Sequence, residues 1–544
     1  MKQLFLLSAL FCISFSASAQ FAGGTGTSND PYQIENAEQL QAVNDFLTSH
    51  FILTEDIDLE DVVWNPIGSF TGVFDGNGHS VNNLRIENGN SGNGLFTRMN
   101  TPGVIKNLTI KDAEIIAGNW SGILCGTNGN WEIQGGDIIN CTIINSSIEG
   151  GENVGAISGV GGGNFDGCRV FNVKVEGTNY VGGISGDNEK GGYFKNNVFY
   201  GDVTSAGYAA GICAFYNGAS RYDVAFENNV VYGNISSSTG TVGGILATPN
   251  WNSENAHIEN CAVFATCSGQ CVGSIGGNAL RGRVQNCYAT GDVKATGLWA
   301  HDQWQDSWNG GICAVNFNGP IMDCYFSGTI STSAEDVKIA GVCGRNWEGI
   351  TVKNTYYNAD GAPMGMGDGD NLSLYDAKEM LPEDMTKMSN FQFSDMAKWQ
   401  NIYGKTTPFF ANQTAPVEIT SCTEVGIEGT CSDNLESLYL YGSLNESILE
   451  PVKIENGNWI VEFKKGDVTL TETISVIAFD RGKMPSMITK AKVKEATGIN
   501  NVENSEDYSV DKIYNAAGQC INTPKAGHVN IIRYTNGKSA KMIK

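Results

Sequence analysis

Short stretches in which apolar and polar residues alternate recur through most of this chain, and glycines and asparagines separate them. Such alternation is typical of β-strands, and no repeat unit has the spacing of an amphipathic helix. Two landmarks return every 24 to 37 residues. One is a glycine before an apolar residue, as in Gly94-Leu95, Gly122-Ile123 and Gly182-Gly183-Ile184. The other is an asparagine before a small or apolar residue, as in Asn83-Leu84, Asn107-Leu108, Asn140-Cys141 and Asn196-Asn197.

A repeat of this length predicts a solenoid, in which each unit is one turn of a coil. The fold we expect is all-β, with a parallel β-helix as its main part. Strands of successive turns then stack at about 4.8 Å, and inward positions form ladders of like residues. Glycine suits the sharp bends, and an inward asparagine can bond to the turns above and below.

Both ends of the coil are expected to carry a capping helix, because an open end exposes unpaired strand edges. Near the start, Asn36 has the position of an N-cap and Gln39 that of its capping-box partner. At the far end, residues 377–388 have helical spacing, and Trp399 with Phe409 and Phe410 is expected to plug the coil. This assigns residues 20–412 to the β-helix with its caps.

Residues 413–497 change to long alternating strands and predict a small Ig-like β-sandwich. Residues 498–544 begin with a polar linker and end in a short C-terminal β-module. At the other end, residues 1–19 combine one lysine, an apolar run and an Ala-Ser-Ala cleavage site. These features predict a secretory signal peptide, and no later segment is apolar for long enough to cross a membrane.

Cysteine positions follow the repeat rather than a disulfide pattern. Of the fifteen cysteines, one lies in the signal peptide. Nine others fall at two fixed places in the repeat and are expected to be free, small apolar fillers of a stacked core: Cys141, Cys168, Cys261, Cys287 and Cys324 at one, and Cys125, Cys213, Cys313 and Cys343 at the other. Outside the repeat, Cys422 and Cys431 are the better candidates for a disulfide.

The repeats resemble those of the GLUG-motif surface proteins of Bacteroidetes and some Gram-positive bacteria. The strings that carry the likeness are GTGTSNDPYQI at 24–34, FILTEDIDL at 51–59 and WNPIGSFTGVFDGNGH at 64–79. Later turns depart from the motif, where its G-L-x-G step becomes GICA or GSIG. The resemblance implies a surface-exposed solenoid and no particular reaction.

The last segment is similar to a type IX secretion sorting domain, through Ile513-Tyr514-Asn515 and Gly518-Gln519. Its Gly527-His528-Val529 step departs from the usual pattern. The likeness implies attachment to the outer-membrane surface, and a purely structural β-module is the alternative.

Aromatic residues recur in the loops between the two landmarks, nearly one in each turn. Stacked in register, they would form a strip whose faces could stack on sugar rings, with neighbouring amides and carboxylates bonding to hydroxyl groups. A second group of aromatic residues lies in the longest turn, GLWAHDQWQDSWNGG. The candidate ligand-binding residues are Trp131, Tyr216, Trp251 and Trp347 in the strip and Trp299, Trp304 and Trp308 in the long turn. The alternative is that these rings only shield the core.

Composition removes several function classes. The formal charge of −24 disfavours nucleic acid, because a protein that reads phosphates needs a basic face. Five scattered histidines and no thiolate cluster make a metal site improbable, and no sequence suggests a cofactor. Carboxylates for catalysis exist, but no spacing selects a pair; they are Asp187, Glu189, Glu254, Asp302, Asp306 and Glu348.

The sequence therefore predicts a secreted, cell-surface solenoid that binds a glycan or another surface partner without cleaving it, as an adhesin or a carbohydrate-binding protein does. Two alternatives stay open. One is a glycoside hydrolase or polysaccharide lyase built on the β-helix, with catalytic residues unknown. The other is a structural component of the surface or matrix.

Overall fold

A computed structural model describes the chain from residue 20 to residue 543 with gaps. The residues outside the description are 1–19, 218–223, 251–252, 254–255, 279, 299–306, 348–349, 370–374, 432–434, 443–447, 452–453, 455–456, 464–467, 469, 471–472, 495–509, 516–518, 522–528, 535–538 and 544. The chain forms two compact units, Met1–Asn412 and Gln413–Lys544. The predicted signal peptide lies outside the described residues.

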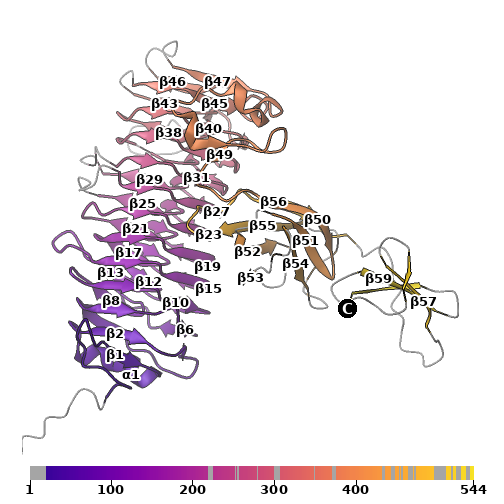
Figure 1. Cartoon of the computed structure of the whole chain (residues 1–544). Coiled ribbons are helices and arrows are strands. Elements are labelled where there is room, and N and C mark those ends of the chain that lie inside the picture. Colours follow the sequence, from indigo (N-terminus) through magenta and orange to yellow (C-terminus); the bar gives the residue numbers. More distant parts are fainter. Residues whose placement is uncertain are drawn as a thin grey trace, which may run out of the picture. The chain divides into compact units, whose positions relative to one another are not determined.

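The first unit is a stack of short strands that wind into a solenoid, as the repeat predicts (Figure 1). One turn consists of β18 (Asn164–Asp166), β19 (Arg169–Gly177), β20 (Tyr180–Gly182) and β21 (Ser185–Asn188). Each strand pairs in parallel with its equivalents in neighbouring turns. The result is four sheets, which we call sheets 1 to 4 after β18, β19, β20 and β21; they contain 12, 17, 8 and 7 strands.

Inward residues form the ladders that the repeat implies. In sheet 1 the rings of Phe165, Phe194 and Phe226 stack on one another, with centroids 4.8 and 5.1 Å apart. All three are fully buried. Stacked rings in register fill the core without voids, which fixes the turns relative to one another.

The corner between sheets 1 and 2 explains the asparagine landmark. Its first residue adopts the left-handed conformation, with φ of +56° at Asn196 and +55° at Asn228. Asparagine tolerates this conformation better than other L-residues with a Cβ. The two side chains also pair along the stack, because Nδ2 of Asn228 donates to Oδ1 of Asn196 at 3.1 Å. Asn83 was wrongly assigned to this landmark. It lies at the next bend of the chain, in register with Asp112, since Arg85 pairs with Glu114.

The second residue of the landmark points inward. Asn197 and Asn229 are fully buried and bond to each other, Nδ2 to Oδ1 at 3.0 Å. Cysteines take the same place in other turns, and the thiol of Cys168 donates to the carbonyl of Ile138 at 3.5 Å. The nine cysteines at the two fixed places in the repeat are free and buried, as predicted.

The start of the solenoid has a short helix, α1 (Ala37–Ala42), where the sequence predicts one. The side chain of Asn36 accepts a hydrogen bond from the backbone N–H of Gln39 at 3.0 Å. Gln39 in turn accepts from the N–H of Glu35, one residue before the capping-box position. Leu40 is buried in the core that the first turns share.

The far end differs from the prediction. Residues 377–380 form a strand, β47 (Ala377–Met380), which pairs in parallel with β45 (Thr355–Asn358). Three 3-10 turns follow at Asp384–Thr386, Met388–Asn390 and Met396–Lys398. The expected helix was wrong because this segment continues sheet 2 for one more rung, where backbone pairing overrides helical spacing.

The aromatic residues after this strand do not plug the end of the coil. They run back along the outer face of sheet 2 and cover a ladder of Tyr288, Tyr325 and Tyr356 on successive turns. Trp399 lies 6.0 Å from both Tyr288 and Tyr325, between ring centroids, and Phe410 lies 5.1 Å from Tyr288. The segment is a strap on the side of the solenoid.

In the second unit, the strands that the structure describes pair with one another in antiparallel sheets. One consists of β50 (Glu418–Thr423), β51 (Gly426–Thr430) and β54 (Asn458–Glu462). Another consists of β53 (Ile448–Pro451), β52 (Leu435–Gly442), β55 (Thr473–Asp480) and β56 (Thr489–Lys492), and the two share one apolar core. The last has the order β58 (Cys520–Ile521), β57 (Val510–Asn515), β59 (Val529–Tyr534), β60 (Ser539–Ile543). An Ig-like topology stays a prediction.

The predicted disulfide between Cys422 and Cys431 is absent. The hairpin of β50 and β51 pairs Cys422 with Ile427, near its turn, whereas Cys431 follows the opposite end of β51. The two sulfur atoms are therefore held apart by the length of the hairpin. Within the described part of the chain, no helix is long and apolar enough to span a membrane.

Candidate functional site

The predicted aromatic strip does not form one continuous surface. Trp131 is its most open member, with 65% of its surface exposed. Its loop is held against the next turns because the backbone N–H of Trp131 donates to Oε2 of Glu189 at 2.7 Å. Trp251, Trp299 and Trp304 lie outside the described residues.

Tyr216 belongs to the core rather than to a binding surface. It is fully buried, and its hydroxyl group donates to the carbonyl of Gly192 at 2.9 Å. Its strand, β25 (Cys213–Tyr216), pairs Tyr216 with Asn188, another buried polar residue. The interpretation of Tyr216 as a ligand-binding residue was therefore wrong, because the register turns the ring inward.

The structure brings Trp308 and Trp347 together around one arginine. The guanidinium carbon of Arg345 lies 4.6 Å from the ring centroid of Trp308 and 3.8 Å from that of Trp347. Phe317, one turn away, also stacks on Trp347 at 5.5 Å. Only 3% of Trp308 is exposed. Trp308 therefore offers no face to a sugar ring, and the cation–π contacts stabilise this part of the solenoid.

A groove on sheet 2 is the better candidate, and it arises from a kink in the strands. β10 (Thr109–Lys111) and β11 (Glu114–Ile116) are separated by Asp112 and Ala113, and Asp112 has φ of +55°. β15 (Thr142–Glu149) and β19 bend at the same place, at Asn145 and Asn172, with φ of +50° and +52°. Stacked kinks make the outer face of sheet 2 concave.

The kink ends at the next turn. Between β19 and β23 (Val198–Ser205) the register shifts, so that Phe171 pairs with Tyr200 and Val173 pairs with Gly201. No residue of β23 corresponds to Asn172. A Cβ atom on Gly201 would lie 2.1 Å from the carbonyl oxygen of Val173, so this close approach requires glycine.

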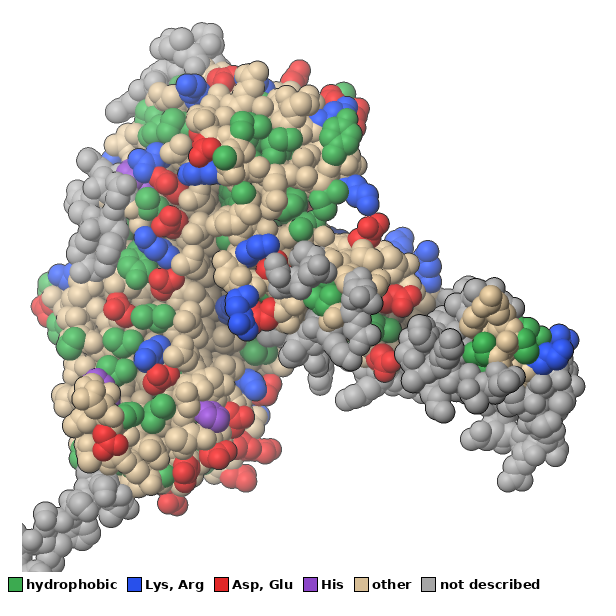
Figure 2. All heavy atoms as spheres, viewed as in Figure 1, with side chains coloured by type: hydrophobic (Ala, Val, Ile, Leu, Met, Phe, Trp, Pro, Cys, Tyr) green, Lys and Arg blue, Asp and Glu red, His purple; other side chains and the backbone are tan. Residues whose placement is uncertain are grey.

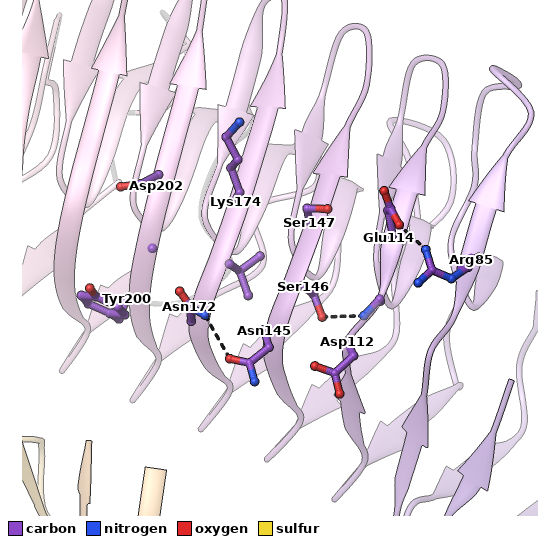
Figure 3. A pocket seen from close by; sticks show the side chains of 13 residues that line it. Arg85, Asp112, Glu114, Asn145, Ser146, Ser147, Asn172, Lys174, Tyr200 and Asp202 are labelled. Carbon is purple, nitrogen blue, oxygen red and sulfur yellow. Dashed lines mark hydrogen bonds and ion pairs between the residues drawn. The ribbon is translucent and has the colours of Figure 1, made fainter. Parts of the chain in front are cut away.

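The resulting groove has a volume of about 480 Å³ and crosses the strands rather than following them. Two rows of side chains border it (Figure 3). One row is in register from strand to strand and consists of Arg85, Glu114, Ser147, Lys174 and Asp202. The other consists of the kink residues Asp112, Asn145 and Asn172, followed by Tyr200.

Hydrogen bonds hold both rows in place. Nδ2 of Asn172 donates to Oδ1 of Asn145 at 3.0 Å, and Arg85 forms an ion pair with Glu114. Lys174 pairs with Glu176 at 2.8 Å, and this contact raises the pKa of Lys174. The groove therefore presents a preorganised set of donors and acceptors beside one half-buried ring.

Of the six acidic residues that the sequence offers for catalysis, Glu254, Asp302, Asp306 and Glu348 lie outside the described residues. Asp187 is almost completely buried, and burial raises its pKa well above the usual range. Its Oδ1 has no hydrogen-bond partner among the described residues, while Oδ2 accepts from Asn153 at 3.4 Å. Neither it nor Glu189 borders the groove. In the described residues no three histidine, cysteine or acidic side chains are grouped to hold a metal ion.

The sequence does contain a signal for the groove. Asp112, Asn145 and Asn172 each follow the left-handed corner by five residues, at 107, 140 and 167, and interrupt a run of β-branched residues. A second ladder of Asp and Asn residues at a fixed offset indicates a second bend in each of these three turns.

Comparisons with known proteins support the repeat. The GLUG motif matches residues 268–294. This is one turn of the solenoid, since Ser268 in β32 (Thr266–Gly269) pairs with Lys294 in β36 (Val293–Ala295). The predicted resemblance to GLUG-motif proteins is therefore supported, although the match lies among the turns whose motif departs from the pattern.

Two relatives have names that point to the cell surface. Halomucin of Haloquadratum walsbyi is 33% identical over 153 residues, which cover 25% of this chain and 2% of halomucin. A protein of Evansella cellulosilytica, named as a Gly-rich membrane protein, is 29% identical over 210 residues, covering 29% of this chain and 24% of that protein. The chain thus spans a small part of each relative. No solved structure matches. The β-solenoid and these relatives fit a cell-surface protein.

Proposed function

We propose that this protein is secreted, is displayed at the cell surface and binds a linear glycan without cleaving it, in the groove of sheet 2. The observation that carries the proposal is the groove itself: about 480 Å³, bordered by two rows of polar side chains that cross successive turns. Sugar hydroxyl groups need donors and acceptors at regular intervals.

The geometry suits a chain rather than a single sugar. Turns of a solenoid are spaced by ~4.8 Å, close to the length of one sugar residue, so each turn can meet one residue of the polymer. Ser147 and Asn145 offer uncharged hydrogen-bonding groups in the middle of the groove, and Tyr200 supplies a ring at its end. Rigid strands hold these groups in place before the ligand arrives, which lowers the entropy cost of binding.

Affinity electrophoresis in gels that contain neutral polysaccharides tests the proposal. Tyr200→Ala and Asn145→Ala should each reduce retention, because the first removes the ring and the second a donor and an acceptor. Trp131→Ala is the matched control, since Trp131 is an exposed aromatic residue that does not border the groove. Loss of retention with Trp131→Ala alone would instead favour the aromatic strip predicted from the sequence.

The same experiment separates binding from catalysis. Incubation with each retained polysaccharide should yield no new reducing ends and no unsaturated-sugar absorbance. Turnover that disappears after Asp112→Asn or Glu114→Gln would replace the binding proposal with a glycoside hydrolase or lyase.

The C-terminal sheet is proposed as the attachment device. β57 contains Tyr514 and Asn515 of the sorting-like string, and the amide of Asn515 bonds to the side chain of Gln519 at 2.9 Å. Deletion of residues 510–544 should leave the protein inside the producing cell or release it unattached. Unchanged surface display of the truncated chain would contradict this role.

A further inference from the structure

Each basic side chain that borders the groove forms an ion pair, whereas two carboxylates of the groove form none among the described residues. Arg85 is paired with Glu114, and Lys174 is paired with Glu176. Asp112 and Asp202 have no ion pair among the described residues. Asp202 accepts a hydrogen bond from Nδ2 of Asn234 at 2.8 Å, which fixes its position and leaves its charge. Uncompensated charge in the groove is therefore negative.

Acidic residues also line the approach to the lower end of the groove. β3 (Ile57–Asp58) pairs with β6 (Ser80–Asn82), and β6 pairs with β10, so β3 continues sheet 2 below the groove. Figure 2 shows acidic side chains gathered at this N-terminal end of the solenoid. The exposed acids of this segment are Glu55, Asp56, Asp58, Glu60 and Asp61.

Hydrogen bonds favour the ionised form of two of these carboxylates, Asp56 and Asp58. The side chain of Asn83 donates to Oδ1 of Asp58 at 2.8 Å, and this bond lowers the pKa of Asp58. The pKa of Asp56 is lowered first by the backbone N–H of Ser80. The chain as a whole carries a formal charge of −24, so no distant basic surplus offsets the local field.

We propose that the groove selects glycans without acidic groups and excludes polyanionic glycans, including those built of uronic acids or sulfated sugars. The inference rests on the proposed glycan-binding function and adds the chemical class of the ligand. A carboxylate on every sugar of a polymer would pass close to Asp112 and Asp202 and to the acids of residues 55–61. An uncharged polymer meets only hydrogen-bonding groups there.

Repulsion should weaken binding moderately for each charge on the glycan and strongly for a polymer that carries many charges. Two like charges about 10 Å apart in water repel enough to weaken binding about twofold. A polyanion meets several such pairs at once, so exclusion by roughly tenfold or more follows at low salt. Screening shortens the range of the repulsion to about 3 Å at 1 M salt, which should remove most of the difference.

Matched polymers test the selectivity, because they share a backbone and differ in charge. Affinity electrophoresis and titration calorimetry are run with hydroxyethyl cellulose against carboxymethyl cellulose, dextran against dextran sulfate, and a neutral galactan against polygalacturonate. The expected result is binding of at least one neutral member with its acidic partner at least tenfold weaker at low salt, and a smaller ratio at 1 M salt. Equal binding of both members overturns the selectivity alone. Failure of all neutral members overturns the proposed function as well.

Variants locate the effect. Asp112→Asn with Asp202→Asn should raise binding of the acidic polymer relative to binding of its neutral partner about fourfold at low salt. Glu335→Gln with Asp336→Asn removes two exposed charges far along the solenoid and serves as the matched control. If both double variants change the binding of the acidic polymer equally, the groove charges are not the selective element.

Discussion

Substitutions at Asn228 measure how much the left-handed corner between sheets 1 and 2 contributes to the free energy of unfolding. Its φ is +55°, and its Nδ2 donates to Asn196. Alanine at this position loses the hydrogen bond, about 0.5–1.5 kcal/mol, and must adopt a conformation that costs about 1–2 kcal/mol for an ordinary L-residue. Because asparagine in the parent protein already has part of this conformational cost, the net loss is smaller than the sum of the two terms. Asn228→Ala should therefore lower the free energy of unfolding of the solenoid by about 1.5–2.5 kcal/mol.

Glycine separates the two contributions. Asn228→Gly loses the same hydrogen bond but adopts positive φ without strain, so it should cost about 1 kcal/mol less than Asn228→Ala. Urea unfolding followed by tryptophan fluorescence measures both variants against the parent protein. An equal loss for glycine and alanine, or a larger loss for glycine, would refute the argument that backbone conformation selects asparagine at the corner.

Three further predictions follow from buried groups. The pKa of Asp187 is raised in the folded protein, so the stability that this residue contributes is full below its pKa in the unfolded chain and is lost as pH rises through its pKa in the folded protein. Asp187→Asn should therefore unfold at a higher temperature than the parent at pH 8, and this difference in unfolding temperature should close near pH 4. A difference that stays constant with pH would contradict the pKa shift. Phe194→Ala should cost about 3–5 kcal/mol in urea unfolding, since it removes the middle ring of a buried stack, whereas a cost below 1 kcal/mol would mean the stack is not part of the core. A thiol reagent should label the native protein fastest at the exposed Cys520, because burial protects the thiols of the repeat and raises the pKa of Cys125 and Cys141 to about 12. Rapid labelling of the repeat cysteines before unfolding would refute their placement in the core.

Periodicity was sufficient to predict the solenoid, because each turn repeats the same local requirements. The left-handed corner at Asn196 and the inward thiol of Cys168 are set by residues within one turn and its neighbours. Residues 377–380 show where this reasoning fails. Their spacing suits a helix, but the open edge of β45 offers backbone partners that only the assembled solenoid provides.

The candidate site was harder to predict for a related reason. Whether an aromatic side chain points inward depends on the parity of its position in the strand, and Tyr216 occupies the inward place that Asn188 has in the preceding turn. Contacts across turns, such as that of Arg345 with Trp308, leave no trace in the sequence. The groove was missed because its kink at Asn145 is a single residue inside an otherwise regular strand.

The central claim is that a linear, uncharged glycan lies in the groove of sheet 2, across the turns. A crystal structure of the protein with the best-retained neutral oligosaccharide tests it most directly. The account predicts a sugar chain that follows the solenoid axis between Lys174 and Asn172, with hydrogen bonds to Ser147 and Asn145 and a sugar ring against Tyr200. A chain bound at Trp131 or at any other face, with the groove of sheet 2 empty, would contradict the account.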